Sequence, residues 1–163
     1  MTRPRAHAAA LALPARTVSC AADRGDCMNQ NVVSDSADFY PAKFVSKPWG
    51  REMIFAEIDD LYVGKVLYVN AGESLSLQLH NEKTETICVI AGRGRLEFGA
   101  DPAALECAAF GPGDVVHLPA GVLHRLSAEE NLVVAEVSTA FSGWRDDIVR
   151  VDDRYGRSGT TAP

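Results

Sequence analysis

The stretch that decides the fold is residues 72–92, which read GESLSLQLHNEKTETICVIAG. From position 74 polar residues and leucines alternate, as the two faces of a β-strand do, and the polar face ends in Gln78 and His80. Three leucines on the other face need cover, and Glu85 follows on the next apolar run. We therefore predict that the polar face lines a barrel interior and that the leucines pack on another sheet or a second subunit. A polar face exposed to solvent is the alternative.

Short apolar runs separated by turn residues occur within this stretch and on both sides of it. They are MIFAEI (53–58), LYVGKVLYV (61–69), TICVI (86–90), RLEFG (95–99), VVHLP (115–119), HRLSA (124–128) and NLVVAEV (131–137). This rhythm predicts an all-β barrel over residues 39–157. The one helical candidate is Trp144 to Tyr155. Residues 1–38 lack a sustained period and are predicted to be a disordered tail, and residues 158–163 a flexible C-terminus.

Composition limits the classes of function. A chain of 163 residues with 47% hydrophobic and 23% charged residues fits one globular domain. The net charge of −6 and the absence of a dense Lys/Arg run argue against a nucleic-acid partner. No apolar run reaches the roughly 20 residues that span a bilayer, so no membrane partner is expected. Cys20, Cys27, Cys88 and Cys107 have no zinc-like spacing and indicate free thiols in a cytoplasmic protein.

Two spaced motifs carry a resemblance. The first is Gly72-x5-Gln78-x-His80-x4-Glu85-x6-Gly92, and the second is Gly113-x5-Pro119-x-Gly121-x2-His124. Together they resemble the pair of motifs of the cupins, with Gln78 in place of the first of two histidines. The resemblance implies a double-stranded β-helix, the cupin jelly-roll barrel.

The spacing has a physical reason that points to a metal ion. Gln78 and His80 point the same way on one strand, Glu85 returns on the next, and the Pro-x-Gly turn delivers His124 from another hairpin. Two imidazoles, a carboxylate and an amide oxygen suit one divalent ion, zinc first, with manganese, iron, nickel or cobalt as alternatives. Taken singly, each residue could instead be a core histidine or a surface glutamate.

A narrower resemblance covers residues 46–157. Lys47-Pro48-Trp49-Gly50, the stretches AGESLSLQLH and LPAGVLHRL, and the tail DDIVRVDDRYGR (146–157) resemble the C-terminal domain of type II phosphomannose isomerases. That family implies metal-dependent interconversion of an aldose 6-phosphate and its ketose isomer. It also implies a base that moves a proton between two carbons and cations that hold a phosphate.

Further residues are candidates for catalysis or substrate binding. Lys65 is a candidate for the phosphate or for acid/base work, Ser76 for a hydrogen bond to the substrate, and His117 for a general base. Arg150 and Arg157 lie in the tail, which could fold back over the barrel mouth and bring a guanidinium to a phosphate. The ordinary alternatives are a solvated lysine, a polar filler, a structural histidine and salt bridges to the neighbouring aspartate doublets.

Two departures from the isomerase pattern bear on the substrate. Thr86-Ile87 stands where His-Trp is usual, and Lys83 replaces an arginine, keeping the charge but losing bidentate recognition. Lys83 remains a candidate substrate-binding residue. The leading hypothesis is a homodimeric, cytoplasmic sugar-phosphate isomerase. The rivals are a metal-dependent cupin with another reaction, such as an oxygenase, lyase or cyclase, and a sugar-binding cupin without catalysis.

Overall fold

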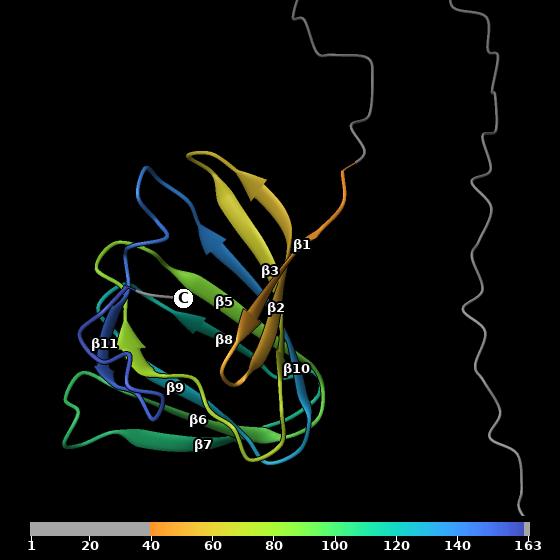
Figure 1. The fold of residues 1–163 in the computed structure, drawn as a ribbon. Helices are drawn as coiled ribbons and strands as arrows, with labels where there is room; N and C mark the ends of the chain where they lie inside the picture. Colours follow the sequence, from red (N-terminus) through yellow and green to blue (C-terminus); the bar gives the residue numbers. More distant parts are fainter. Residues whose placement is uncertain (1–39, 162–163) are drawn as a thin grey trace, which may run out of the picture. The chain divides into compact units, whose positions relative to one another are not determined.

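The structure is a computed structural model that describes residues 40–161, and these fold as eleven β-strands in two antiparallel sheets (Figure 1). The six-stranded sheet has the order β1 (Lys43–Lys47), β2 (Gly50–Ile58), β3 (Tyr62–Val69), β10 (Leu132–Thr139), β5 (Glu85–Ala91) and β8 (Val115–Leu118). The five-stranded sheet has the order β11 (Val149–Asp152), β4 (Leu77–Leu79), β9 (Leu123–Ala128), β6 (Gly94–Gly99) and β7 (Glu106–Phe110). The all-β prediction is confirmed. The described residues include no helix suited to crossing a membrane.

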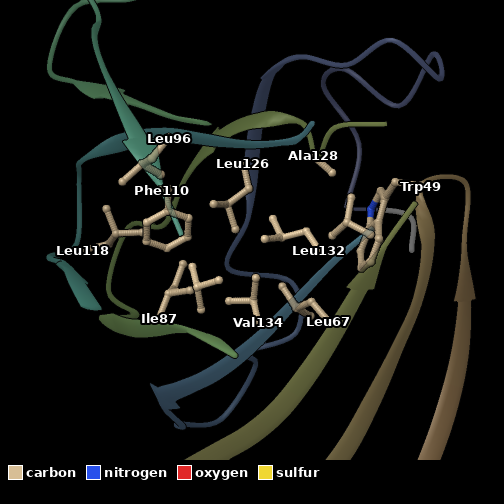
Figure 2. Close-up of a cluster of buried hydrophobic side chains, with 12 residues drawn as sticks. Trp49, Leu67, Ile87, Leu96, Phe110, Leu118, Leu126, Ala128, Leu132 and Val134 are labelled. Atoms are coloured by element: carbon tan, nitrogen blue, oxygen red, sulfur yellow. The ribbon is translucent and has the colours of Figure 1, made fainter. Parts of the chain in front are cut away.

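The two sheets share one apolar core. In Figure 2, Leu118, Ile87, Val134 and Leu67 of the six-stranded sheet lie opposite Phe110, Leu96, Leu126 and Ala128 of the five-stranded sheet, and Trp49 closes one end. Alternate residues of each strand supply these side chains, because successive residues of a strand face opposite sides of the sheet. The inward face of β10 shows how the core gives way to a polar region: Leu132 and Val134 are followed by Glu136 and Ser138, all buried.

The helical prediction for residues 144–155 is wrong. Val149–Asp152 forms β11, which pairs with β4 so that Arg150 lies opposite Gln78. Asp147 precedes this strand and Asp153 follows it, and their carboxylates accept backbone hydrogen bonds. Strands β1 and β7 were also not predicted. Residues 1–38, the predicted tail, lie outside the described residues.

The leucine stretch follows its predicted alternation only in part. Leu77 is 4% exposed and belongs to neither barrel core, as expected of the outer face. Leu75, however, packs against the core and lines the same cavity as Ser76 and Gln78. The reason is that β4 begins only at Leu77. Before it the chain makes an isolated bridge at Ser74, so two successive side chains point inward.

Two motif glycines hold the turns that position the polar region. Gly92 has φ +79°, and a Cβ there would lie 2.1 Å from the Asn131 carbonyl oxygen, so only glycine fits. Gly121 has φ +81°, and its N–H donates a 2.7 Å hydrogen bond to the His80 carbonyl. The turn of the second motif is thereby tied directly to the end of β4.

Candidate metal centre

Three buried side chains meet at the polar end of the barrel. His80 follows β4, Glu85 opens β5 and His124 lies on β9 beside Gln78. The Nε2 atom of His80 is 3.3 Å from Glu85 Oε1, and the Nε2 atom of His124 is 3.3 Å from Glu85 Oε2. One ligand atom from each of the three residues lies within 4.8 Å of the other two. Segments of both sheets therefore bring three candidate metal ligands, two imidazoles and a carboxylate, to one point.

Backbone carbonyls orient both imidazoles. His80 Nδ1 hydrogen-bonds to the Asp147 carbonyl oxygen, and His124 Nδ1 lies 3.0 Å from the Val122 carbonyl oxygen. A carbonyl accepts only, so each Nδ1 carries the proton and each Nε2 presents a lone pair to the site. Both Nε2 atoms are buried and lack a hydrogen-bond partner.

This arrangement places electron pairs against electron pairs. When both rings are neutral, the Nε2 lone pairs face the oxygens of one carboxylate, and a cation among them, either a metal ion or a proton on Nε2, relieves this contact. Zinc bonds of about 2.0–2.2 Å to nitrogen and oxygen are compatible with ligand atoms 3.3 Å apart. The residues present therefore fit a divalent ion.

The charge of Glu85 is stabilised on several sides. Burial by itself raises the pKa of the Glu85 carboxyl, but the hydrogen bonds that His124 and His80 donate to it when no metal ion is bound, together with the Lys83 ammonium, oppose this, and the pKa lies well below its ordinary value. Lys83 Nζ is 2.6 Å from Glu85 Oε1, and both side chains are 5% exposed. Lys83 thus shares a carboxylate oxygen with the candidate metal site.

Gln78, the fourth predicted ligand, faces the same cavity. It is buried, and its side-chain oxygen accepts a 2.6 Å hydrogen bond from the Ser76 hydroxyl. An amide oxygen has two lone pairs, so this hydrogen bond leaves one for a further partner. Ser76 is therefore placed to orient Gln78 as well as to face a substrate.

Asp147 supports the site and was missed by the sequence reasoning. Its carboxylate accepts backbone hydrogen bonds from Asn81 (2.9 Å), Glu82 (3.1 Å) and Lys83 (2.8 Å). Burial raises the pKa of this carboxyl, but the three N–H groups lower it, and the net shift is downward. The tail residue thus holds the loop between His80 and Glu85, as outer partners of metal ligands do. No periodicity in the sequence marks such a contact.

A cavity of about 370 Å³ is lined by two of the three ligands, His80 and Glu85. Strands β1 to β5, β10 and the tail all contribute to its lining, and the tail does fold back over the barrel mouth. The lining cations are Lys47, Lys65, Lys83, Arg145, Arg150 and Arg157, against the carboxylates Glu52, Glu85, Glu136 and Asp146. The cavity is therefore suited to an anionic ligand.

The two tail arginines differ in their partners. Arg157 forms a two-point ion pair with Asp153, whose side chain is fully buried, at 3.0 Å for both contacts. Arg150 is 8% exposed and donates to the Thr160 carbonyl, yet its Nε is buried without a partner. Burial, and then the Arg157 cation, lower the pKa of Arg150. Thr160 and Thr161 belong to the segment predicted to be flexible, and Thr161 lines the cavity.

Lys65 lies on the inward face of β3 and pairs with a residue that was not predicted. Its Nζ is 3.2 Å from Glu136 Oε1 and 5.4 Å from the centre of the Trp144 ring. Burial lowers the pKa of Lys65, but Glu136 and Glu52 raise it, and the net shift is upward. Lys65 is therefore charged at neutral pH. The signal for Glu136 was its inward parity with Leu132 and Val134 in the run NLVVAEV.

His117 does not join these residues. It is exposed on β8, on the outer face of the six-stranded sheet, and its Nδ1 lies 3.0 Å from the Thr86 hydroxyl. Alternation along the strand explains the placement, because inward-facing Val116 and Leu118 flank it. The departures Thr86 and Ile87 also lie off the cavity: Thr86 is exposed, and Ile87 is 2% exposed within the apolar core.

Known proteins resemble this chain in sequence. Residues 35–153 match the family described as mannose-6-phosphate isomerase C-terminal. Mannose-1-phosphate guanylyltransferase ManC of Salmonella typhimurium is 32% identical over 117 residues, covering 69% of this chain and 23% of the relative. The chain therefore spans about a quarter of the length of such curated relatives.

Solved structures resemble the barrel at low identity. The capsular polysaccharide assembling protein CapF of Staphylococcus aureus aligns with a TM-score of 0.59 and 19% identity, over 71% of this chain and 33% of CapF. Oxalate decarboxylase of Bacillus subtilis, a protein with Mn(II) centres, aligns with a TM-score of 0.54 and 19% identity, over 67% of this chain and 30% of that protein. At such identity the likeness shows a common fold.

Proposed function

Because the chain belongs to the mannose-6-phosphate isomerase C-terminal family and has the cupin fold, we propose that it is a metal-dependent isomerase of sugar phosphates. The substrate would be an aldose 6-phosphate of the mannose type, converted to its 2-ketose isomer. One observation carries the proposal: His80 and Glu85 of the His80–Glu85–His124 trio line a cavity that has more lining cations than carboxylates. The two-sheet architecture and the solved structures that resemble it confirm the predicted cupin fold, and the isomerase reaction is the step that needs an experiment.

The resident ion would be held by four side chains. His80 and His124 would bind it through their free Nε2 atoms, Glu85 through a carboxylate oxygen and Gln78 through its side-chain oxygen. Zinc is the first candidate, and manganese, iron, nickel or cobalt also suit nitrogen and oxygen ligands. Such an ion, when bound, acts as a Lewis acid on the sugar oxygens.

Binding of the phosphate would fall to the cations farther along the cavity. Arg150 offers a buried Nε without a partner, and Arg157 contributes a second guanidinium fixed by Asp153. Lys47 lines the same cavity, where Glu52 lies 3.4 Å away. Guanidinium groups suit phosphate because their planar N–H pairs match its oxygens.

Glu136 is the residue that we assign to proton transfer. In the aldose-to-ketose direction the C2 proton moves to the Glu136 carboxylate and returns to C1, while the hydroxyl proton of O2 passes to O1. Lys65 stays charged beside it and holds the carboxylate in place, which argues against Lys65 as the base. The Trp144 ring lies beside the Lys65 ammonium and lines the same cavity.

The test couples metal analysis with an isomerisation assay. We expect the purified protein to retain about one divalent ion per chain and to interconvert mannose 6-phosphate and fructose 6-phosphate, with deuterium from D₂O appearing at C2 of the aldose. Glu136→Gln should lower kcat by about 10²–10⁴-fold, the usual contribution of a general base, and retain the ion. The exposed Glu130→Gln is the matched control and should behave as the unaltered protein.

The contrary results separate the rivals. A metal-loaded protein that is inert on both sugar phosphates would refute the isomerase assignment. Oxygen consumption with an obligatory iron would then favour an oxygenase. Carbohydrate binding without turnover under several metals would favour a binding protein. Full activity of Glu136→Gln would remove Glu136 from the reaction while leaving the metal site intact.

A further inference from the structure

The outer face of the six-stranded sheet is unusually apolar for a surface exposed to water. Of the eleven large hydrophobic side chains that are exposed among the described residues, eight lie on strands of this sheet or in the β2–β3 turn. Five strands contribute to this face through Phe44, Tyr62, Ile90, Val115 and Val137, each between 45% and 64% exposed. Scattered hydrophobic residues are common on surfaces, but a continuous patch marks an interaction site.

Strand register shows that these side chains share one face. Val137 of β10 lies opposite Thr86 of β5 and Gly64 of β3, and Val115 of β8 lies opposite Cys88 of β5. The inward neighbours on the same strands, Glu136 and Ile87, belong to the barrel interior. Hydrogen-bonded strands from β1 to β8 therefore present a single surface whose centre is β3 and β10.

This face carries almost no charge. At the outward positions of the six strands Arg51 is the one residue with a formal charge at neutral pH. Its guanidinium already stacks over Tyr68 at 4.6 Å and over Phe44 at 5.9 Å. A second copy of the chain presents the same uncharged surface, so contact between two copies would bury no unpaired carboxylate or ammonium from the centre of the face.

The size of the face is close to what a stable dimer needs. With about 4.8 Å between strands and about 3.3 Å per residue, six strands of four to nine residues give a footprint of roughly 600–700 Å². Standard protein interfaces bury about 800 Å² per partner, and homodimer interfaces are the more apolar class. Accessible area exceeds a flat footprint, so the face is large enough.

We propose that two copies of this chain pack through the outer faces of their six-stranded sheets, related by a two-fold axis. Aligned sheets pack face to face about 10 Å apart, and a two-fold axis matches a surface with itself. The leucine face that suggested a dimer from the sequence is not the contact, since Leu77 is already 4% exposed within one chain. In each copy the candidate metal centre faces the barrel interior, on the side of the sheet opposite to this contact.

The test uses the full chain and measures its mass in solution, first unaltered and then with a charged residue placed on the proposed contact face. Sedimentation equilibrium should give twice the chain mass of 17.5 kDa at micromolar concentrations. Val137→Lys, at the centre of the face, should raise the dissociation constant at least 100-fold, and Val115→Lys should also weaken the dimer. Val151→Lys is the matched control, because Val151 is an exposed valine of β11 in the other sheet. Circular dichroism checks that each variant is folded.

A native cysteine gives a second readout. Cys88 lies on the proposed contact, whereas Cys107 is exposed on β7 of the other sheet. Alkylation of Cys88, followed by mass spectrometry, should accelerate on dilution and in Val137→Lys, while Cys107 reacts at a constant rate. A monomer at every concentration, or a dimer that Val137→Lys leaves intact, would overturn the proposal. A monomer would mean that something other than a second copy of this chain covers the face.

Discussion

Asp147→Asn should loosen the loop that carries the candidate metal ligands. The carboxylate of Asp147 accepts three backbone hydrogen bonds, two on Oδ2 from Glu82 and Lys83 and one on Oδ1 from Asn81. Asparagine keeps the shape but has one acceptor oxygen, so its NH₂ group must face at least one of these N–H donors. The remaining hydrogen bonds also lose the contribution of the charge.

The magnitude follows from these contacts. A hydrogen bond to a charged group contributes about 1.5–3 kcal/mol, and a neutral hydrogen bond about 1 kcal/mol. Asp147→Asn loses one such bond and weakens two, and water can partly replace them at the exposed Asn81 and Glu82. The substitution should therefore lower the unfolding free energy by about 2–3 kcal/mol. Affinity for the ion should fall about 10-fold or more, as it does when an outer partner of a metal ligand is removed. The His80 contact is made by the backbone carbonyl of Asp147 and should survive.

The assay is urea unfolding of the metal-free protein at several pH values, followed by calorimetric titration with Zn²⁺. The pKa of Asp147 is lowered in the folded state, so its contribution is complete above the ordinary carboxyl pKa of about 3.9 and is lost as the pH falls through the lower folded value. The difference between the two proteins should therefore be constant near neutrality and vanish in acid. Asp59→Asn, in the exposed β2–β3 turn, is the control. Equal stability and equal zinc affinity would refute the reasoning.

Three further predictions concern the site and the core. His124→Ala should abolish metal retention and leave a folded barrel, and full metal occupancy by elemental analysis would contradict the ligand assignment. Arg157→Lys should raise KM for the sugar phosphate without loss of metal, because lysine keeps the charge but not the two-point contact; unchanged kinetics would exclude Arg157 from the site. Ile87→Ala should lower the unfolding free energy by about 2–5 kcal/mol in a thermal or urea assay, since Ile87 is 2% exposed in the core; a change below about 1 kcal/mol would argue against that packing.

Local pattern was enough for several features. Period-two alternation predicts strands and says which residues of a strand share a face, and motif glycines predict turns with positive φ. His80, Glu85 and His124 could therefore be grouped from spacing together with the family resemblance, and the structure brings their ligand atoms together. The same spacing could not exclude His117, because alternation does not say which face of β8 is inside.

What the sequence determined by itself is the β architecture, the turns and the set of residues able to bind a metal, since these follow from interactions between near neighbours. The packing of the two sheets against each other determined the remaining features of the structure. It placed Glu136 beside Lys65, brought Asp147 under the loop after His80, turned residues 149–152 into a strand and left one sheet face apolar and exposed. Each depends on contacts between segments far apart in the chain, and no local period encodes such contacts.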